Sequence, residues 1–279
     1  MDINWRKVGT KALYILAAAF AAFMTLFLSY AIFWMFNTDT MATAMMADTT
    51  VLLFFGYLYW KFKFKNKDKA FVLHEKPTAL KLGILLVLFV IITTALNTLF
   101  AYIVANIDST GMDERSDTIA ELTWTYIIVF SVILAPICEE LTYRLFIYNF
   151  LKKEFNWKIA MFISCFLFGI MHGTGPHLVI GMIMGMGCVM VNEISGCQYV
   201  SIGCHILYNF LTIFVPSQEL AESGAFTIGC LVVIILIYIG LIIRTESVYD
   251  KAKREETAGR GKRSKVFGGK VTGKLQGRR

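Results

Sequence analysis

Residues 131–151 read SVILAPICEELTYRLFIYNFL, a mostly apolar run that contains the formal charges of Glu139, Glu140 and Arg144. About 20 apolar residues are enough to cross a bilayer as an α-helix. An ionisable side chain at the bilayer centre costs about 2.5–3.5 kcal/mol on insertion scales, so such residues face a bundle interior or a wet cavity. The run therefore predicts a membrane helix that carries a functional site.

The composition of the whole chain is that of a membrane protein. Of its 279 residues, 57% are hydrophobic and only 17% are charged, and the mean hydropathy is +0.61. Soluble domains have about 45–50% apolar and about 25% charged residues. We therefore expect an all-α polytopic membrane protein. The apolar segments predict about eight transmembrane helices, at about residues 12–36, 42–60, 82–106, 122–151, 157–173, 177–194, 199–215 and 225–243.

The distribution of lysine and arginine predicts the orientation of these helices, because basic loops stay in the cytoplasm. Residues 61–76, KFKFKNKDKAFVLHEK, are rich in lysine, as are residues 152–158 and the chain from Arg244 onward. The loops that would lie on the opposite side carry mostly acidic residues. Eight crossings with both termini in the cytoplasm place every loop consistently. We expect an integral protein of a prokaryotic plasma membrane, with a site that opens toward the cytoplasm.

The segments divide the chain into four predicted regions. Residues 1–121 form an N-terminal three-helix membrane region with a basic cytoplasmic loop, and residues 122–215 form the core that contains the buried charges. Residues 216–243 form the last transmembrane helix. Residues 244–279 are basic and contain few large apolar side chains, so they predict a disordered cytoplasmic tail. The net charge of +7 follows from this topology, and we expect no nucleic-acid partner.

The three charges of the opening run divide into two roles. Glu140 and Arg144 are four residues apart, so they lie on one helix face with the acid before the base. Glu139 points about 100° away from Glu140. The spacing predicts that Glu140 and Arg144 form a structural ion pair, while Glu139 faces a cavity. A carboxylate placed in that way is a candidate general base.

Two histidines and an asparagine on other predicted helices complement these charges. His172 lies at the end of the predicted segment 157–173, in FGIMHG. His205 lies early in the predicted segment 199–215, in HILYN, where Asn209 follows one helical turn later. Counting about 1.5 Å per residue from the predicted cytoplasmic ends puts Glu139 about 18 Å deep, His172 about 22 Å and His205 about 9 Å. Single intramembrane histidines often form hydrogen bonds between packed helices. Jointly these residues predict a functional site, because each of them adds an insertion cost.

The motifs in residues 122–215 resemble the CAAX-processing type II prenyl endopeptidase and bacteriocin-processing family, called CPBP or Abi. The motifs are Glu139-Glu140-x-x-x-Arg144, Phe168-x-x-x-His172 and His205-x-x-x-Asn209. This resemblance implies an intramembrane endopeptidase of the glutamate type. Glu140 and Arg144 would support the site.

The resemblance also implies a role for each remaining polar residue. Glu139 would be the general base that activates water, assisted by His172. His205 and Asn209 would bind the carbonyl oxygen and stabilise the tetrahedral oxyanion. The substrate would be a lipidated, CAAX-like or hydrophobic peptide, and the other expected partner is membrane lipid.

We expect no cofactor, and a zinc ion is the main alternative. Glu139, His172 and His205 are a plausible zinc set with an open position for water. The H-E-x-x-H helix of soluble zinc proteases is absent from the sequence. The 6 cysteines contain no C-x-x-C pair, so we expect neither a zinc ribbon nor a disulfide framework.

Other function classes use the same polar residues differently. In a non-enzymatic bacteriocin-immunity or scaffold protein they would only stabilise the helix bundle. In a transporter, a membrane carboxylate would relay protons. Loss of the Glu139 carboxylate distinguishes a protease from an immunity or scaffold protein, because it abolishes proteolysis but is tolerated by a scaffold. The substrate and the oligomeric state stay open.

Overall fold

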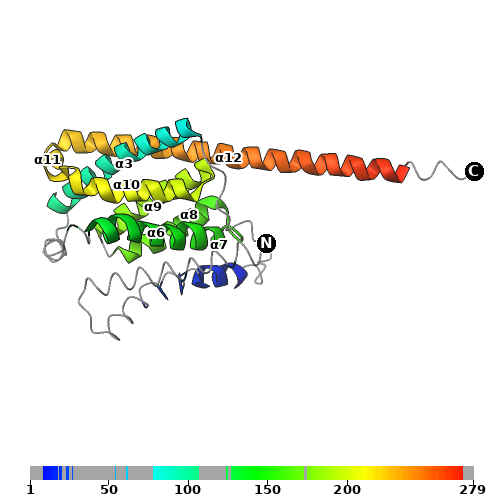
Figure 1. Ribbon diagram of the computed structural model, residues 1–279, viewed down its shortest axis with the longest axis horizontal. Helices are drawn as coiled ribbons and strands as arrows, with labels where there is room; N and C mark the ends of the chain where they lie inside the picture. The colour runs from blue at the N-terminus through cyan, green and yellow to red at the C-terminus, as the bar shows by residue number, and fades with distance from the viewer. Residues whose placement is uncertain are drawn as a thin grey trace, which may run out of the picture.

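The computed structural model describes residues 9–17, 19–20, 23–24, 27, 54, 61, 78–106, 124, 127–172 and 175–272, with side chains as far as Arg254. No strand occurs in these residues, which confirms the all-α fold class. The first two predicted segments, 12–36 and 42–60, lie largely outside the described residues. Figure 1 shows the described helices side by side in a bundle, with the C-terminal helix extending far beyond it.

The helices that form the bundle come from residues 79–272. In chain order they are α3 (Ala79–Asn106), η3 (Ile127–Leu134), α6 (Ala135–Glu139), η4 (Glu140–Tyr148), α7 (Asn149–Leu151), α8 (Trp157–Met171), α9 (Pro176–Ser195), α10 (Gln198–Phe214), α11 (Ser217–Ala221) and α12 (Gly224–Thr272). Among the described residues, α3, α9 and the Gly224–Arg254 part of α12 are long and apolar enough to cross a membrane, and α8 is a shorter apolar helix. The chain is an integral membrane protein. The count of eight crossings and the side of the termini stay predictions.

The helix that carries the three charges changes pitch along its length. η3 and η4 are π-helical, and the five residues Ala135–Glu139 between them are α-helical. Pro136 lies in the first turn of α6, where its missing N–H removes a backbone hydrogen bond. The Asn149 side chain donates to the carbonyl oxygens of Arg144 and Leu145, at 3.2 and 2.9 Å. Turns of π-helix are frequent at functional sites, and here Glu139 is the last residue of α6 and Glu140 is the first residue of η4.

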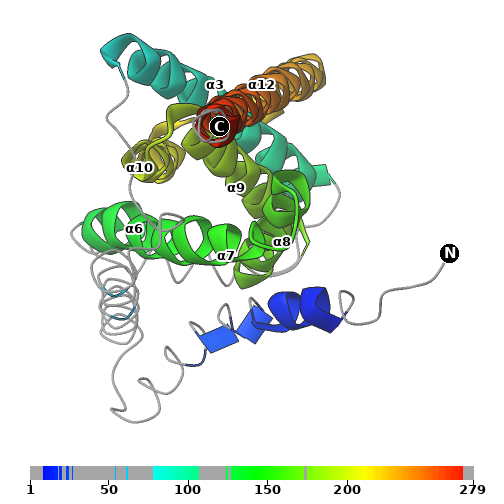
Figure 2. The ribbon, with the colours of Figure 1, turned by 90° about the vertical axis from the view of Figure 1, so that its right-hand side faces the viewer.

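Helix α9 lies in the middle of the bundle, in contact with α3, α8, α10 and α12 (Figure 2). Its close contacts depend on glycine. A Cβ atom at Gly169 of α8 would lie 2.6 Å from the carbonyl oxygen of Leu178, and one at Gly187 would lie 2.8 Å from the hydroxyl of Tyr238 on α12. That hydroxyl donates to the carbonyl oxygen of Ile183 at 2.5 Å. Small residues therefore allow the neighbours of α9 to approach its backbone closely.

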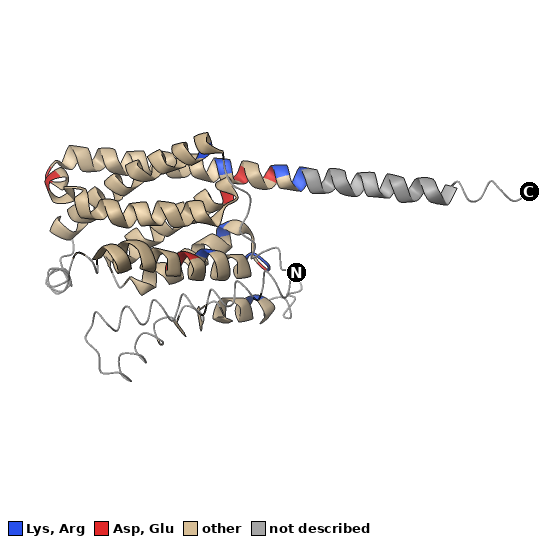
Figure 3. Cartoon of the chain, in the orientation of Figure 1, with Lys and Arg blue, Asp and Glu red and all other residues tan. Residues whose placement is uncertain are grey.

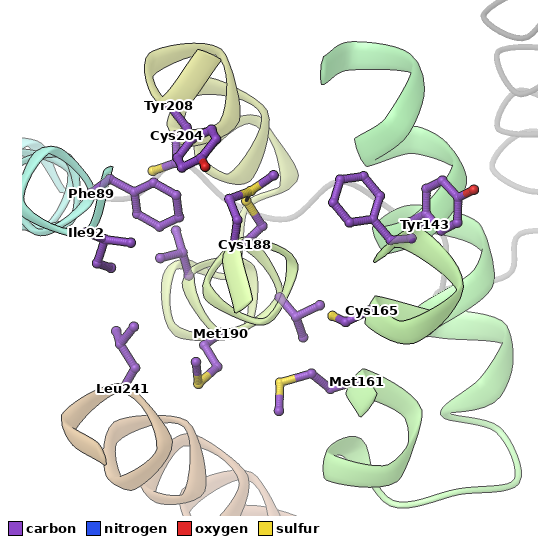
Figure 4. Packing of buried hydrophobic residues seen from close by; sticks show 14 of the residues in the cluster. Phe89, Ile92, Tyr143, Met161, Cys165, Cys188, Met190, Cys204, Tyr208 and Leu241 are labelled. Carbon is purple, nitrogen blue, oxygen red and sulfur yellow. Dashed lines mark hydrogen bonds between the residues drawn. The ribbon is translucent and has the colours of Figure 1, made fainter. Parts of the chain in front are cut away.

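The apolar core surrounds α9 and joins it to helices on both sides. Figure 4 shows Phe89 and Ile92 of α3, Cys188 of α9 and Leu241 of α12 within one packed cluster. The cysteines are buried and none forms a disulfide, as expected for small apolar side chains. They are Cys138, Cys165, Cys188, Cys197, Cys204 and Cys230.

Helix α12 is much longer than the sequence predicts. The last transmembrane helix was expected to end at residue 243 and to be followed by a disordered tail, whereas α12 continues unbroken to Thr272 (Figure 1). Residues 241–258 contain neither proline nor glycine, so nothing in this stretch interrupts a helix. Residues 273–279 of the predicted tail lie outside the described residues.

Polar contacts hold the part of α12 beyond residue 243 against the ends of two other helices. Lys158 of α8 forms an ion pair with Glu246. The Tyr249 hydroxyl donates to Glu193 of α9 at 2.8 Å, and Lys152 reaches the same carboxylate at 2.6 Å. These contacts at the bundle end explain why the helix does not stop at the predicted position.

Candidate active site

Charged residues mostly lie at the two ends of the bundle, and one acidic and one basic stretch interrupt the otherwise uncharged α6–η4 helix (Figure 3). Glu139 is the last residue of α6, and Glu140 is the first residue of η4. Helix α10 packs against both α6 and η4, and α8 packs against η4. These contacts bring residues from α8 and α10 to the two carboxylates.

Glu140 is fully buried and has partners on its own helix and on α10. The Arg144 Nε atom lies 3.3 Å from its Oε1, and neither side chain is exposed, so the predicted ion pair is present. The Ser201 hydroxyl donates to Oε2. His205 Nδ1 lies 3.0 Å from Oε1, and the Gln198 side chain donates to the main-chain oxygen of Glu140 at 3.4 Å. Several contacts therefore join α10 to this one residue.

The Arg144 guanidinium packs on an aromatic ring of the second motif. Its Cζ lies 4.1 Å from the centroid of Phe168, a cation–π contact. The ring of Phe168 also lies 4.4 Å from that of His172 and 5.9 Å from that of His205, between centroids. A Cβ atom at Gly185 would lie 2.9 Å from Arg144 Nη2. Phe168 thus packs against Arg144, His172 and His205. The position of Phe168 in the sequence motif did not predict these contacts.

Glu139 has a different environment from Glu140. Its side chain is 28% exposed, as is that of His172, whereas His205 is buried. The His205 Nε2 atom lies 3.5 Å from Glu139 Oε2, and the His172 Nε2 atom lies 3.9 Å from Glu139 Oε1. The structure therefore places Glu139, His172 and His205 around one point, although their predicted depths differ. Counting residues from the predicted helix ends therefore misjudges the depth of His205 relative to Glu139 and His172.

The hydrogen-bond partner of Nδ1 in each histidine indicates which ring nitrogen carries the hydrogen. His172 Nδ1 lies 2.9 Å from the carbonyl oxygen of Phe168, which only accepts hydrogen bonds, so this nitrogen donates. His205 Nδ1 likewise donates to the Glu140 carboxylate. When these rings are neutral, Nε2 of each carries a lone pair, and both Nε2 atoms face the Glu139 carboxylate. A group of acceptors with no donor of its own is suited to take a proton from water.

Asn209 lies one helical turn after His205, on the partly exposed side of α10. Its Nδ2 donates to the main-chain oxygen of Ser131 in η3 at 2.8 Å. This bond uses one of the two N–H groups of the amide. The predicted oxyanion role of Asn209 requires the other N–H group, and that role stays a prediction.

Within the described residues, two groups near the buried charges have the chemistry of metal ligands. Glu140, Cys188 and His205 present ligand atoms within 4.8 Å of one another, but Arg144 already neutralises Glu140, and His205 donates to it. That set does not fit a cation. Glu139 with the two Nε2 atoms fits zinc better, because each imidazole has a partner on its other nitrogen, as zinc-bound histidines usually do.

Sequence reasoning missed Ser201 and Gln198. Both lie on α10 before His205, and Ser201 is four residues from it, on the same helix face. A buried serine in a membrane helix is common, so the spacing alone is a weak signal. The spacing of Ser201 and His205 indicates a shared role only once the packing of α10 against Glu140 is known.

Comparisons with known proteins agree with this part of the chain. A family model described as type II CAAX prenyl endopeptidase Rce1-like matches residues 121–211. A curated protein of Bacillus subtilis (strain 168), described as "Putative membrane peptidase YdiL", is 29% identical over 91 residues. The match covers 33% of this chain and 37% of that protein, so the chain spans little more than a third of its relative's length. No solved structure matches. The resemblance seen in the three motifs is confirmed over residues 121–211.

Proposed function

We propose that this protein is an intramembrane endopeptidase of the glutamate type. The observation that carries the proposal is the convergence of two histidine Nε2 atoms on Glu139, at 3.5 and 3.9 Å. The family match over residues 121–211 supports the same reaction class. No serine or cysteine nucleophile is needed, because water is the attacking group.

In the proposed reaction, Glu139 and His172 bind a water molecule and orient it toward the scissile carbonyl. The water oxygen forms a bond to the carbonyl carbon as its proton passes to Glu139. The carbonyl oxygen becomes an oxyanion, which accepts hydrogen bonds from the Asn209 amide and from Nε2 of His205, where the ring takes up a proton from solvent before the attack and keeps it through this step. The C–N bond then breaks, and Glu139 returns the proton to the leaving amine.

Glu140 and Arg144 shape this site without touching the substrate. The Glu140 carboxylate orients the His205 ring and stabilises the positive charge that the ring gains, as the aspartate of a serine-protease triad does. Arg144 neutralises Glu140 in the dry interior. This division of roles explains why two adjacent glutamates differ so much in exposure, at 28% for Glu139 and 0% for Glu140.

We propose that the reaction needs no metal, with zinc as the alternative. In the zinc alternative, Glu139, His172 and His205 would hold the ion. The ion would lower the pKa of a water molecule bound to it. Chelation separates the two versions of the mechanism.

The proposed substrate is a lipidated, CAAX-like or otherwise hydrophobic peptide. The site lies on helices with lipid-compatible surfaces, so a substrate carried in the membrane can reach it without leaving the bilayer. The family description names the CAAX class. We further propose eight crossings with cytoplasmic termini in a prokaryotic plasma membrane, and a site open to the cytoplasm, on the basis of the basic loops.

A cleavage assay with purified protein in detergent tests the proposal. The substrates are farnesylated C-terminal peptides and hydrophobic leader peptides, and the variants are Glu139→Gln and the matched control Glu219→Gln, which alters an exposed glutamate on α11. We expect cleavage by the wild type and the control, none by Glu139→Gln, and unchanged cleavage with a zinc chelator. Loss under chelation would assign Glu139 to a zinc site. Intact, stable protein that cleaves no peptide would favour the immunity or scaffold function.

A further inference from the structure

Ser201 and Glu140 form a buried contact next to the proposed catalytic residues. We propose that Ser201 is a positioning residue, which holds the Glu140 carboxylate toward α10 and thereby keeps the hydrogen of His205 on Nδ1. The part of this inference that concerns catalysis rests on the proposed function. The part that concerns the state of the His205 ring does not.

Ser201, Glu140 and His205 are all buried, so their polar atoms depend on one another for hydrogen bonds. Ser201 and Glu140 are 0% exposed, and His205 is 1% exposed. Water cannot replace a lost partner easily in such a place, so each polar atom depends on the protein for its hydrogen bonds. Oε2 of Glu140 accepts from Ser201. Oε1 accepts from His205 Nδ1 and faces Arg144 Nε.

The way Arg144 meets Glu140 indicates what Ser201 contributes. An arginine and a carboxylate usually pair through two parallel hydrogen bonds. Here only Nε approaches the carboxylate, as an ion pair at 3.3 Å, and within the described part of the chain none of Nε, Nη1 and Nη2 has a hydrogen-bond partner. The second oxygen of Glu140 is directed to Ser201 instead of to the Arg144 fork. Ser201 therefore competes with Arg144 for the orientation of this carboxylate.

Loss of the Ser201 hydroxyl removes that competition. Oε2 would be left without a donor on α10, and the carboxylate would gain by turning toward the unpaired Nη groups of Arg144. His205 Nδ1 would then lose its acceptor. The ring would be free to carry its hydrogen on Nε2, which faces Glu139, and the site would lose one of the two lone pairs that receive protons.

The ring of His205 can be observed directly. We would record nitrogen-15 spectra of histidine-labelled protein in detergent, and assign His205 by comparison with His205→Gln. The test variant is Ser201→Ala. The matched control is Ser164→Ala, since Ser164 is equally buried and its hydroxyl donates to the main-chain oxygen of Tyr143 at 2.7 Å, on the same helix η4. We expect protonated Nδ1 in the wild type and the control, and unprotonated Nδ1 in Ser201→Ala.

Kinetics provide the second readout. We expect kcat of Ser201→Ala to fall by about tenfold to a hundredfold, the range known for outer partners that orient metal-bound histidines, with little change in KM. Ser201→Thr, which keeps a hydroxyl, should retain more activity than Ser201→Ala. Ser164→Ala should keep the wild-type kcat. Thermal unfolding curves show whether each variant is folded.

A His205 spectrum of Ser201→Ala identical to that of the wild type would overturn the inference, even if the variant were less stable. Equal kcat values for Ser201→Ala and Ser164→Ala would do the same. Absence of cleavage by the wild type would count against the proposed function alone, and the His205 spectrum would then decide the role of Ser201.

Discussion

Glu140 and Arg144 form an ion pair of 3.3 Å in which both side chains are completely buried. Removing one member of such a pair leaves an uncompensated charge in a medium of low dielectric constant. We expect Arg144→Met to lower the free energy of unfolding by about 3–5 kcal/mol, measured by SDS titration in mixed micelles. Lys158→Met breaks the exposed ion pair with Glu246 and, because exposed ion pairs contribute little to stability, should lower the free energy of unfolding much less than Arg144→Met does. An Arg144→Met protein as stable as Lys158→Met would contradict the buried role.

Gly185 provides the space in which Arg144 lies. An alanine Cβ there would come within 2.9 Å of Nη2, 3.3 Å of Cys165 Sγ and 3.3 Å of Phe168. Overpacking of this kind costs about 1–3 kcal/mol. We expect Gly185→Ala to lower both thermal stability and peptide cleavage. Gly203→Ala on α10 is the matched control, because a Cβ at that position meets nothing within 4 Å. If both variants unfold at the same temperature, the predicted contact with Arg144 is not there.

His172 and His177 are five residues apart, which allows a controlled test of the site. His172 faces Glu139, whereas the ring of His177 packs against Phe100 of α3, with 4.8 Å between centroids. We expect His172→Ala to reduce kcat by about 10²- to 10⁴-fold, as is usual for loss of a residue that assists proton transfer. His177→Ala should leave kcat close to that of the wild type. The test is a comparison of kcat for the two variants on one farnesylated peptide. Similar losses in both would contradict a role of His172 in the mechanism.

Asn209 is the proposed uncharged donor to the oxyanion. Removing one such donor costs about 10²- to 10³-fold in kcat in other proteases, and we expect a loss of that size for Asn209→Ala. The control is Asn106→Ala, since Asn106 also bonds a main-chain oxygen, that of Tyr102 at 2.9 Å, at the far end of α3. Initial rates at saturating peptide measure kcat. A loss confined to KM would instead make Asn209 a residue that binds the ground state of the substrate.

Much of the fold could be predicted from local sequence. The predicted segments 82–106 and 199–215 correspond closely to α3 (Ala79–Asn106) and α10 (Gln198–Phe214), because long apolar runs have few alternatives in a membrane. The Glu140–Arg144 pair followed from a spacing of four residues. Both results depend only on geometry within a single helix.

The rest of the site depends on how separate helices are rotated against one another. His205 bridges Glu139 and Glu140, with one ring nitrogen toward each carboxylate. No spacing along α10 predicts that bridge, because it requires the register of α10 against α6 and η4. The contribution of Ser201 was missed for the same reason. The length of α12 was underestimated because its charged half is stabilised by contacts with Glu193 and Lys158, which are distant in sequence.

The continuous α12 has a practical consequence for imaging so small a membrane protein. Its 49 residues would measure about 74 Å at 1.5 Å per residue, whereas a bilayer core is only about 30 Å thick. The helix therefore projects from the bundle as a stalk, braced at its base by Tyr249 and Glu246. A helical fusion partner joined in register shortly after Tyr249 would be attached next to the contacts that hold α12 to the bundle. Such a fiducial would give electron cryomicroscopy the mass outside the micelle that particle alignment requires.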